Sequence, residues 1–141
     1  MAYCTLWDLV SVFGETEILQ LLDRDGDGWP DSAYTEQLIS DVTAEINSYL
    51  RVRYSLPLSV TPSRINAIAC DFFRYRAYTF EPLEIVIARY KDGMAYLRDV
   101  AAGRAQLDVD VFPEAAADTM TGSPDYFADD RVFSATTLTG F

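Results

Sequence analysis

Apolar residues recur at intervals of three and four along most of the first hundred positions, and this spacing restricts the fold more than any other feature of the sequence. Glycine and proline interrupt the pattern, which divides it into separate helices. The spacing predicts a mainly α fold, a small bundle of four to five helices. The expected helices cover approximately residues 5–13, 15–22, 32–53, 61–78 and 82–102.

The predicted helix ends rest on residues that commonly cap helices. Thr5 followed by Asp8 resembles a capping box, and Thr61-Pro62 places a hydroxyl before a proline at the first helical position. In the last helix, apolar residues repeat at 4, 3, 4, 3 and 4, a spacing typical of a seam packed along another helix. The seam consists of Leu83, Ile87, Tyr90, Met94, Leu97 and Ala101.

The pattern changes after Gly103, so we divide the chain into a helical bundle over residues 1–103 and an extended C-terminal arm over residues 104–141. Alternating apolar and acidic residues at 107–111 predict a short β segment in the arm. Residues 113–124 are rich in Ala, Thr and Gly, whereas the last eleven residues regain large apolar groups. We expect an arm that is mobile in the free protein and anchored on a neighbour by Phe133, Leu138 and Phe141. The alternative is a tail that folds back onto its own bundle.

Several function classes are disfavoured by composition. The chain has no His, which excludes triads with a His base and zinc sites that need imidazole. Its two cysteines, Cys4 and Cys70, lie far apart in apolar stretches and are expected to be buried free thiols. No apolar run reaches the ~18–20 residues that span a bilayer. No glycine-rich phosphate loop or paired carboxylates are evident, so we expect no enzymatic activity.

The net charge of −11 is unevenly distributed along the chain. Residues 1–50 contain ten acidic residues and one basic residue. Residues 51–104 contain five acidic and nine basic residues, and residues 105–141 contain seven acidic residues and one basic residue. A basic middle between acidic ends can pair with itself or with a neighbouring copy. The alternative is a solvated surface without a partner. The overall sign disfavours binding to free nucleic acid.

An aspartate-rich stretch between the second and third predicted helices resembles the first half of an EF-hand calcium loop. Tyr34 occupies the position where the twelfth residue, a bidentate Glu, is expected. We therefore expect either a weak Ca²⁺ site or a polar turn without a cation. The candidate ligands are the side chains of Asp23, Asp25, Asp27 and Asp31 and the carbonyl of Trp29.

Two short basic stretches allow two interpretations. Arg51 and Arg53 close a predicted helix, and Arg74 and Arg76 lie near the end of the next one. With their neighbouring aromatic residues they could bind nucleic acid. The stronger interpretation is that Arg51 and Arg53 interact with the carbonyl end of the helix, and that Arg74 and Arg76 pair with acidic partners across an interface.

The sequence resembles a Mu-like phage protein family over nearly its whole length. Residues 1–9, MAYCTLWDL, match the family start M-A-Y-x-T-x-x-D-L. Residues 44–58 are similar to A-x-x-I-D-x-Y-L…R-Y-x-L-P-L, and residues 68–76 to I-A-x-D-I-A-R-Y-x-L. The aspartate loop, the last helix and the C-terminus, including Arg131, Val132 and Phe133, also match.

The resemblance implies a head–tail connector, also called an adaptor or head-completion protein. Such proteins form a homo-oligomeric ring, expected to hold twelve copies, beneath the portal of a tailed-phage capsid and offer a surface to the stopper or tail. It implies a structural virion protein of the neck, made in the host cytoplasm, with the portal and a stopper or tail-completion protein as partners. The alternatives are a calcium-dependent protein-interaction module and a nucleic-acid-binding accessory protein.

Overall fold

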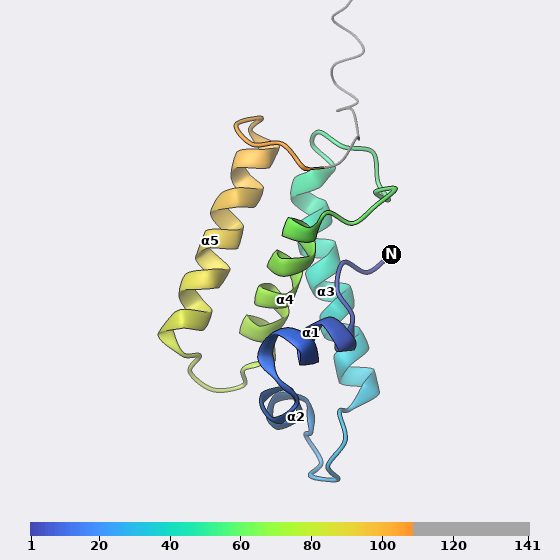
Figure 1. The fold of residues 1–141 in the computed structure, drawn as a ribbon, viewed down its shortest axis with the longest axis vertical. Coiled ribbons are helices and arrows are strands. Elements are labelled where there is room, and N and C mark those ends of the chain that lie inside the picture. Colours follow the sequence, from blue (N-terminus) through green and yellow to red (C-terminus); the bar gives the residue numbers. More distant parts are fainter. Residues whose placement is uncertain (109–141) are drawn as a thin grey trace, which may run out of the picture.

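The computed structural model describes residues 1–108, and these form a bundle of five α helices (Figure 1). The prediction of a mainly α fold is confirmed, and none of the described residues forms a strand. Within the described chain, no helix combines the length and the hydropathy that crossing a membrane requires. The helices are α1 (Leu6–Phe13), α2 (Glu15–Leu22), α3 (Ser32–Leu50), α4 (Ser63–Ala77) and α5 (Glu84–Ala101).

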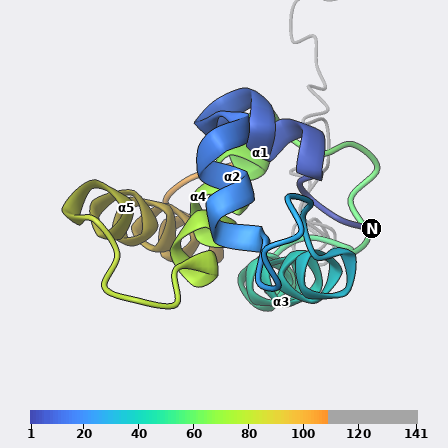
Figure 2. The same ribbon diagram turned by 90° about the horizontal axis from the view of Figure 1, so that it is seen from below.

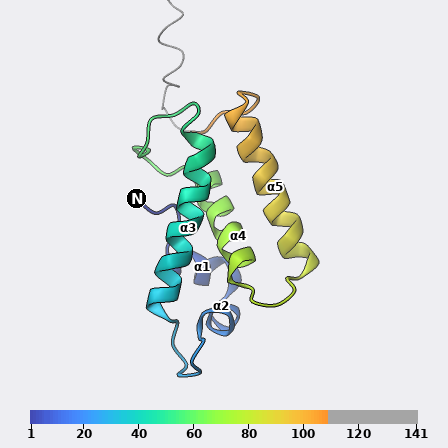
Figure 3. The ribbon, with the colours of Figure 1, turned by 180° about the vertical axis from the view of Figure 1, so that it is seen from behind.

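The three long helices, α3, α4 and α5, pack against one another, and α4 lies between α3 and α5 in the end-on view (Figure 2). The short helices α1 and α2 lie across one face of the long helices, where α1 contacts α4 (Figures 1 and 3). The N-terminal segment runs beside α3, so that α3 and the N-terminus form one flank of the molecule and α5 forms the other.

Local capping determines where the first helices begin and end. The Thr5 hydroxyl accepts a hydrogen bond from the Asp8 amide at 3.3 Å, and the Asp8 carboxylate accepts one from the Thr5 amide at 2.8 Å. This confirms the predicted capping box. Gly14 has φ +92°, a backbone conformation that glycine adopts without strain, and it both ends α1 and begins α2.

Three predicted helix boundaries are wrong by a few residues. Helix α3 ends at Leu50, and Arg51 to Arg53 form a turn that brings the Tyr54 side chain into the core. Pro62 is the N-cap of α4 and not its first helical residue. The N-terminus of α4 has no side-chain cap hydrogen bond, so the Thr61 hydroxyl is not a cap as predicted. Helix α5 begins at Glu84 instead of Pro82.

The predicted seam of α5 is partly correct. Leu97 is buried, and Tyr90 and Met94 pack against the core as expected. Leu83, however, precedes the helix and is exposed. The buried positions also include Val86, Gly93 and Val100, because the helix is turned toward α4 at its glycine.

The core is centred on α4, where the rings of Phe72 and Phe73 are fully buried. Helix α5 approaches α4 so closely that a Cβ added to Gly93 would lie 2.7 Å from Cε1 of Phe72 and 3.2 Å from Cγ2 of Ile68. Only a residue without a side chain fits between the two helices at this point.

Past the expected end of the bundle at residue 103, the chain still packs on the core. Leu107 is buried, and its amide donates a hydrogen bond to the Tyr54 hydroxyl at 3.1 Å. Leu107 and Asp108 are not part of a strand, and the rest of the expected β segment lies outside the described residues. The same holds for the predicted arm anchors Phe133, Leu138 and Phe141, and for Arg131 and Val132, which were also expected to bind a partner.

We predict that Gly93→Ala lowers the melting temperature. Replacing glycine by alanine favours a helix by about 1 kcal/mol, but overpacking a filled core costs about 1–3 kcal/mol, and the added Cβ would lie 2.7 Å from the fully buried Phe72 ring. Thermal unfolding followed by circular dichroism measures the difference. Ala95→Gly, at an exposed position of the same helix, is the control for helix propensity. A Gly93→Ala protein that melts at a higher temperature than the wild type would contradict the close packing.

Candidate functional site

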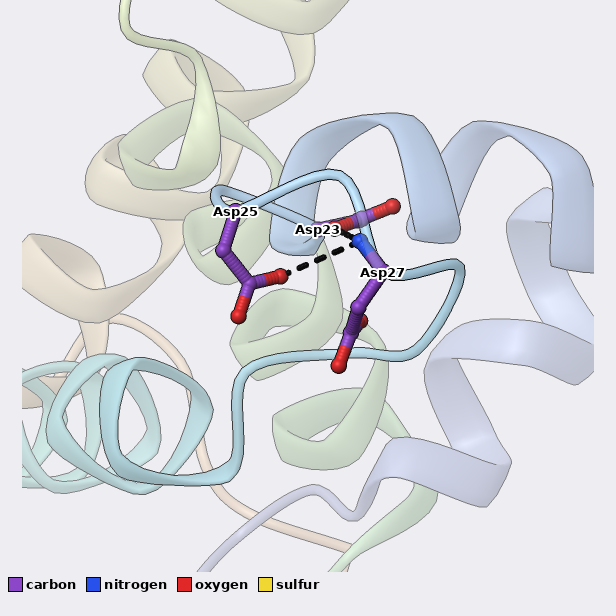
Figure 4. A group of neighbouring side chains, drawn as sticks. All are labelled: Asp23, Asp25 and Asp27. Carbon is purple, nitrogen blue, oxygen red and sulfur yellow. Dashed lines mark hydrogen bonds between the residues drawn. The ribbon is translucent and has the colours of Figure 1, made fainter.

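The aspartate loop connects α2 to α3 at one end of the bundle (Figure 1). Its carboxylates converge, since Asp23, Asp25 and Asp27 each offer an oxygen atom within 4.8 Å of the others (Figure 4). These are three of the five predicted calcium ligands. Asp25 and Asp27 are exposed and Asp23 is half-buried, so the cluster is open to solvent on its Asp25 and Asp27 side chains.

Asp23 organises the loop from its first position. One carboxylate oxygen accepts hydrogen bonds from the Gly26 amide at 2.7 Å and the Asp27 amide at 3.1 Å, and the other accepts one from the Gly28 amide at 2.9 Å. These bonds, the Gly28 bond above all, lower the pKa of Asp23. Gly26 and Gly28 have φ of +81° and +84°, which allows the backbone to fold around a single carboxylate.

The remaining predicted ligands have other surroundings. The Asp31 carboxylate accepts a hydrogen bond from the Tyr34 amide at 3.2 Å and caps α3, and it is not part of the carboxylate cluster. The Tyr34 ring lies 4.6 Å from the guanidinium carbon of Arg24 in a cation–π contact. Calcium takes six to eight oxygen ligands, so an ion held by the three converging carboxylates would need carbonyl and water oxygens as well. Calcium binding therefore stays a prediction.

We predict that Ca²⁺ raises the melting temperature if the three carboxylates bind it. A ligand that binds only the folded state stabilises it by about 2.7 kcal/mol at a hundredfold excess over its dissociation constant. Thermal unfolding in millimolar calcium and in chelator measures the shift. Asp25→Asn should abolish the shift, because the amide oxygen can still accept the Asp27 bond but the charge is lost. Asp41→Asn on α3 is the control and should keep the shift. If the wild-type unfolding curves in calcium and in chelator are identical, the loop binds no calcium and is a polar turn.

Arg74 joins α4 to the short helices. Its Nε lies 2.6 Å from Oε1 of Glu17 on α2, and the same oxygen accepts a hydrogen bond from the Tyr78 hydroxyl at 3.2 Å. The guanidinium carbon also lies 4.7 Å from the centre of the Phe13 ring. Arg74 is largely buried, with a side-chain exposure of 13%. It therefore serves as an internal link within this chain.

Arg76 joins α4 to α3 and, through a shared carboxylate, to α5. Its Nη2 lies 2.6 Å from Oε2 of Glu45, and Oε1 of Glu45 accepts a hydrogen bond from the Tyr90 hydroxyl at 3.0 Å. The Tyr90 ring stacks on Tyr75 with centroids 4.1 Å apart. Burial, together with the Glu45 contact, raises the pKa of Tyr90 to about 12, and the hydrogen bond to Glu45 raises that of Arg76.

The four basic residues expected at a partner surface differ in their contacts: two form ion pairs within this chain, and two lie at the end of α3. Arg74 and Arg76 have acidic partners in their own chain, because Glu17 and Glu45 lie on adjoining helices. Arg51 is exposed in the turn after α3, and the Arg53 guanidinium lies against Gly103. Sequence reasoning identified the basic residues but not these partners, which lie 57 and 31 positions away.

We predict that Tyr90→Phe lowers stability at neutral pH by about 1 kcal/mol through loss of the Glu45 hydrogen bond. The wild-type protein should also lose stability as the pH rises from 10.0 through about 12. The folded state holds the tyrosine proton more tightly than the unfolded chain, so the stabilisation is complete below the unfolded pKa and lost above the folded one. Melting temperatures measured across this range should converge for the two proteins. A constant difference would contradict the raised pKa of Tyr90.

Two surface features were missed by the sequence reasoning. A hollow of about 440 Å³ lies between α3 and the N-terminal segment. On the opposite flank, Phe80, Leu83 and Ile85 expose large apolar side chains around the start of α5. Neither feature forms a sequence motif. The residues of the hollow come from two separate stretches of the chain, and the three apolar residues are separated by other residues. The hollow is lined by Met1, Ala2, Glu36, Ile39, Ser40, Thr43, Ala44 and Asn47.

Another hollow, of about 310 Å³, lies between α4 and α5. Asp71 on α4 pairs there with Arg89 on α5 at 3.4 Å. Burial raises the pKa of Asp71, and the nearby Arg89 opposes that shift. Arg64 and Asp92 also line this hollow, so its charges are balanced. The buried thiols Cys4 and Cys70 are free, as predicted.

Comparison with known proteins identifies an acidic helical-bundle protein of the Mu-like phages. The family described as Bacteriophage Mu, Gp36 matches residues 3–123, which is most of the chain. The protein is 34% identical over 112 residues to gene product J of Escherichia phage Mu, covering 78% of this chain and 79% of that protein. It is 30% identical over 77 residues to the Mu-like prophage FluMu protein gp36 of Haemophilus influenzae, covering 55% of each chain. The chain therefore belongs to the Gp36 family of bacteriophage Mu.

Proposed function

We propose that the protein is a structural component of the phage neck, forming an adaptor ring between the capsid portal and the stopper or tail. The proposal rests on the family match over residues 3–123. This match covers the helical bundle and the first part of the chain that follows it. The resemblance of this pattern to head–tail connectors supplies the role. The proposed partners are the portal, the stopper or tail-completion protein, and further copies of this chain, twelve in a complete ring.

The structure supports this proposal through its surface. Large apolar side chains, among them Trp7, Trp29 and Phe80, are each about 70% exposed, and they belong to α1, the aspartate loop and the connection between α4 and α5. Single exposed apolar side chains are common on folded proteins, so these residues are compatible with several contacts but do not by themselves mark one. A protein that contacts a portal, a stopper and two neighbouring copies needs several such surfaces. The charge of −11 suits contact with basic protein surfaces better than direct contact with the packaged DNA.

The proposed role predicts that the full chain assembles on purified portal into a ring visible by negative-stain electron microscopy. A chain ending at residue 130 should keep its melting temperature and lose this assembly, because the proposed anchors Phe133, Leu138 and Phe141 are removed. Assembly should also weaken as salt rises, because rim charges at an interface are screened.

The controls separate this role from its alternatives. Assembly in chelator distinguishes a connector from a calcium-dependent interaction module, and retention on DNA tests an accessory role in nucleic-acid binding. A full chain that does not bind portal at any salt concentration would overturn the proposed function. A shortened chain that melts at a much lower temperature would show that the C-terminus belongs to its own bundle.

A further inference from the structure

We propose that Cys4 and Cys70 form a disulfide when the folded protein meets hydrogen peroxide, and that this bond ties the N-terminal segment to α4. The two cysteines of the chain are both buried as free thiols in this structure. Cys4 belongs to the segment that leads into α1, and Cys70 lies in the middle of α4 (Figure 1). The chemistry belongs to the chain by itself and is independent of the assembly that the chain joins.

The two thiols are neighbours in space, although they lie far apart in the sequence. Their side chains are within hydrogen-bonding range of each other. Cys4 is 2% and Cys70 1% exposed, and both belong to the hydrophobic core. A disulfide forms without movement of the backbone only where two cysteines already lie close together. The fold therefore meets the first requirement for a bond between them.

Asn66 holds the segment that carries Cys4 against α4. Its Nδ2 donates a hydrogen bond to the Tyr3 carbonyl, directly before Cys4, at 2.9 Å. Asn66 lies four positions before Cys70, so the two side chains occupy the same face of α4. On the other side, the Tyr3 hydroxyl donates a hydrogen bond to Oδ1 of Asn47 on α3. The backbone beside Cys4 is thus held by two helices, which keeps its sulfur next to Cys70.

A polar hollow of about 370 Å³ gives a small molecule a path to Cys4. The hollow lies between the N-terminal segment and the start of α4, and its lining includes Cys4, Thr5, Asp8, Ser63 and Asn66. Cys70 is not among the lining residues. The pair therefore consists of an outer thiol, Cys4, and an inner thiol, Cys70.

The contact gives the two sulfurs different acidities. The hydrogen bond with Cys70 lowers the pKa of Cys4, against the opposing effects of burial and of the Asp8 charge. The same hydrogen bond, together with burial, raises the pKa of Cys70. The thiolate is the nucleophile in sulfur oxidation. Cys4 therefore reacts first, and Cys70 follows as the resolving thiol.

The reaction needs one hydrogen peroxide for each disulfide. The Cys4 thiolate sulfur attacks one peroxide oxygen, the O–O bond breaks, and the leaving hydroxide takes up the proton that Cys4 released, forming water. Cys4 is then a sulfenic acid. The Cys70 sulfur attacks the Cys4 sulfur, the S–S bond forms and the S–O bond breaks, and the hydroxyl leaves as water with the Cys70 proton. Two thiols are oxidised to one disulfide, and the peroxide is reduced to two waters.

Intact-mass measurement on the folded wild type tests the bond. Peroxide should lower the mass by about 2 Da, and the oxidised chain should offer no thiol to an alkylating reagent after unfolding. A dithiol reductant should restore both thiols. Proteolysis of the oxidised chain should release a linked pair of peptides that contain Cys4 and Cys70.

The melting temperature reports whether the bond fits the folded chain. The oxidised wild type should melt on the order of 10 °C above the reduced protein, because the disulfide closes a long loop in the unfolded chain. Reduction should reverse the shift.

Two single variants distinguish the outer from the inner thiol. Cys70→Ala leaves Cys4 beside the hollow without a resolving partner, so peroxide should produce a sulfenic acid that a dione reagent traps. Cys4→Ala leaves only the covered thiol, which should react with peroxide at least about tenfold more slowly. Neither variant should gain melting temperature on oxidation. The wild-type measurements do not depend on whether either variant folds.

Several results would overturn the proposal. These are a wild-type mass that does not change, a gain of oxygen without a cross-link, and a disulfide that joins two chains instead of closing within one. A bond within the chain that lowers the melting temperature would also contradict it, because the tie would then not fit the folded structure. None of these measurements involves the portal. Their failure would leave the proposed function in place, and a chain that does not assemble on portal would leave the disulfide in place.

Discussion

The burial of α4 is the constraint on which the rest of this structure depends. Helices on both sides and the short N-terminal helices cover it, and its two adjacent phenylalanines, Phe72 and Phe73, are fully buried on different faces. A helix covered in this way needs neighbours that can approach closely. Gly93 provides this on α5, because the Phe72 ring occupies the space where a side chain would be.

A buried helix that carries cations requires partners for them. Arg74 and Arg76 lie at the end of α4, and an unpaired charge at a site such as that of Arg74 would be costly. Glu17 on α2 pairs with Arg74, and Glu45 on α3 pairs with Arg76. The hydroxyls of Tyr78 and Tyr90 donate further hydrogen bonds to Glu17 and Glu45, respectively. The two ion pairs link α4 to α2 and α3, and the Tyr90 hydrogen bond to Glu45 adds α5. They also use charges that sequence reasoning had assigned to an interface.

The aspartate loop shows how one sequence motif can serve two purposes. Asp23 folds the loop by accepting three backbone hydrogen bonds, and Asp31 begins α3 as its N-cap. Both roles concern the connection between α2 and α3, and neither requires a metal ion. The convergence of Asp23, Asp25 and Asp27 is compatible with a cation as well.

The sequence alone determined which segments are helical and where most of them begin, because periodicity, capping residues and glycines act within a few positions. Residues 15–22 and the Thr5 capping box were predicted correctly for this reason. It also determined the family, since that depends on a pattern spread over the whole chain. Only the tertiary structure decided the partners of Arg74 and Arg76, the orientation of α5, and the two flanking surfaces. These depend on residues tens of positions apart and on which face of each helix turns inward, and the close approach at Gly93 decides that face for α5.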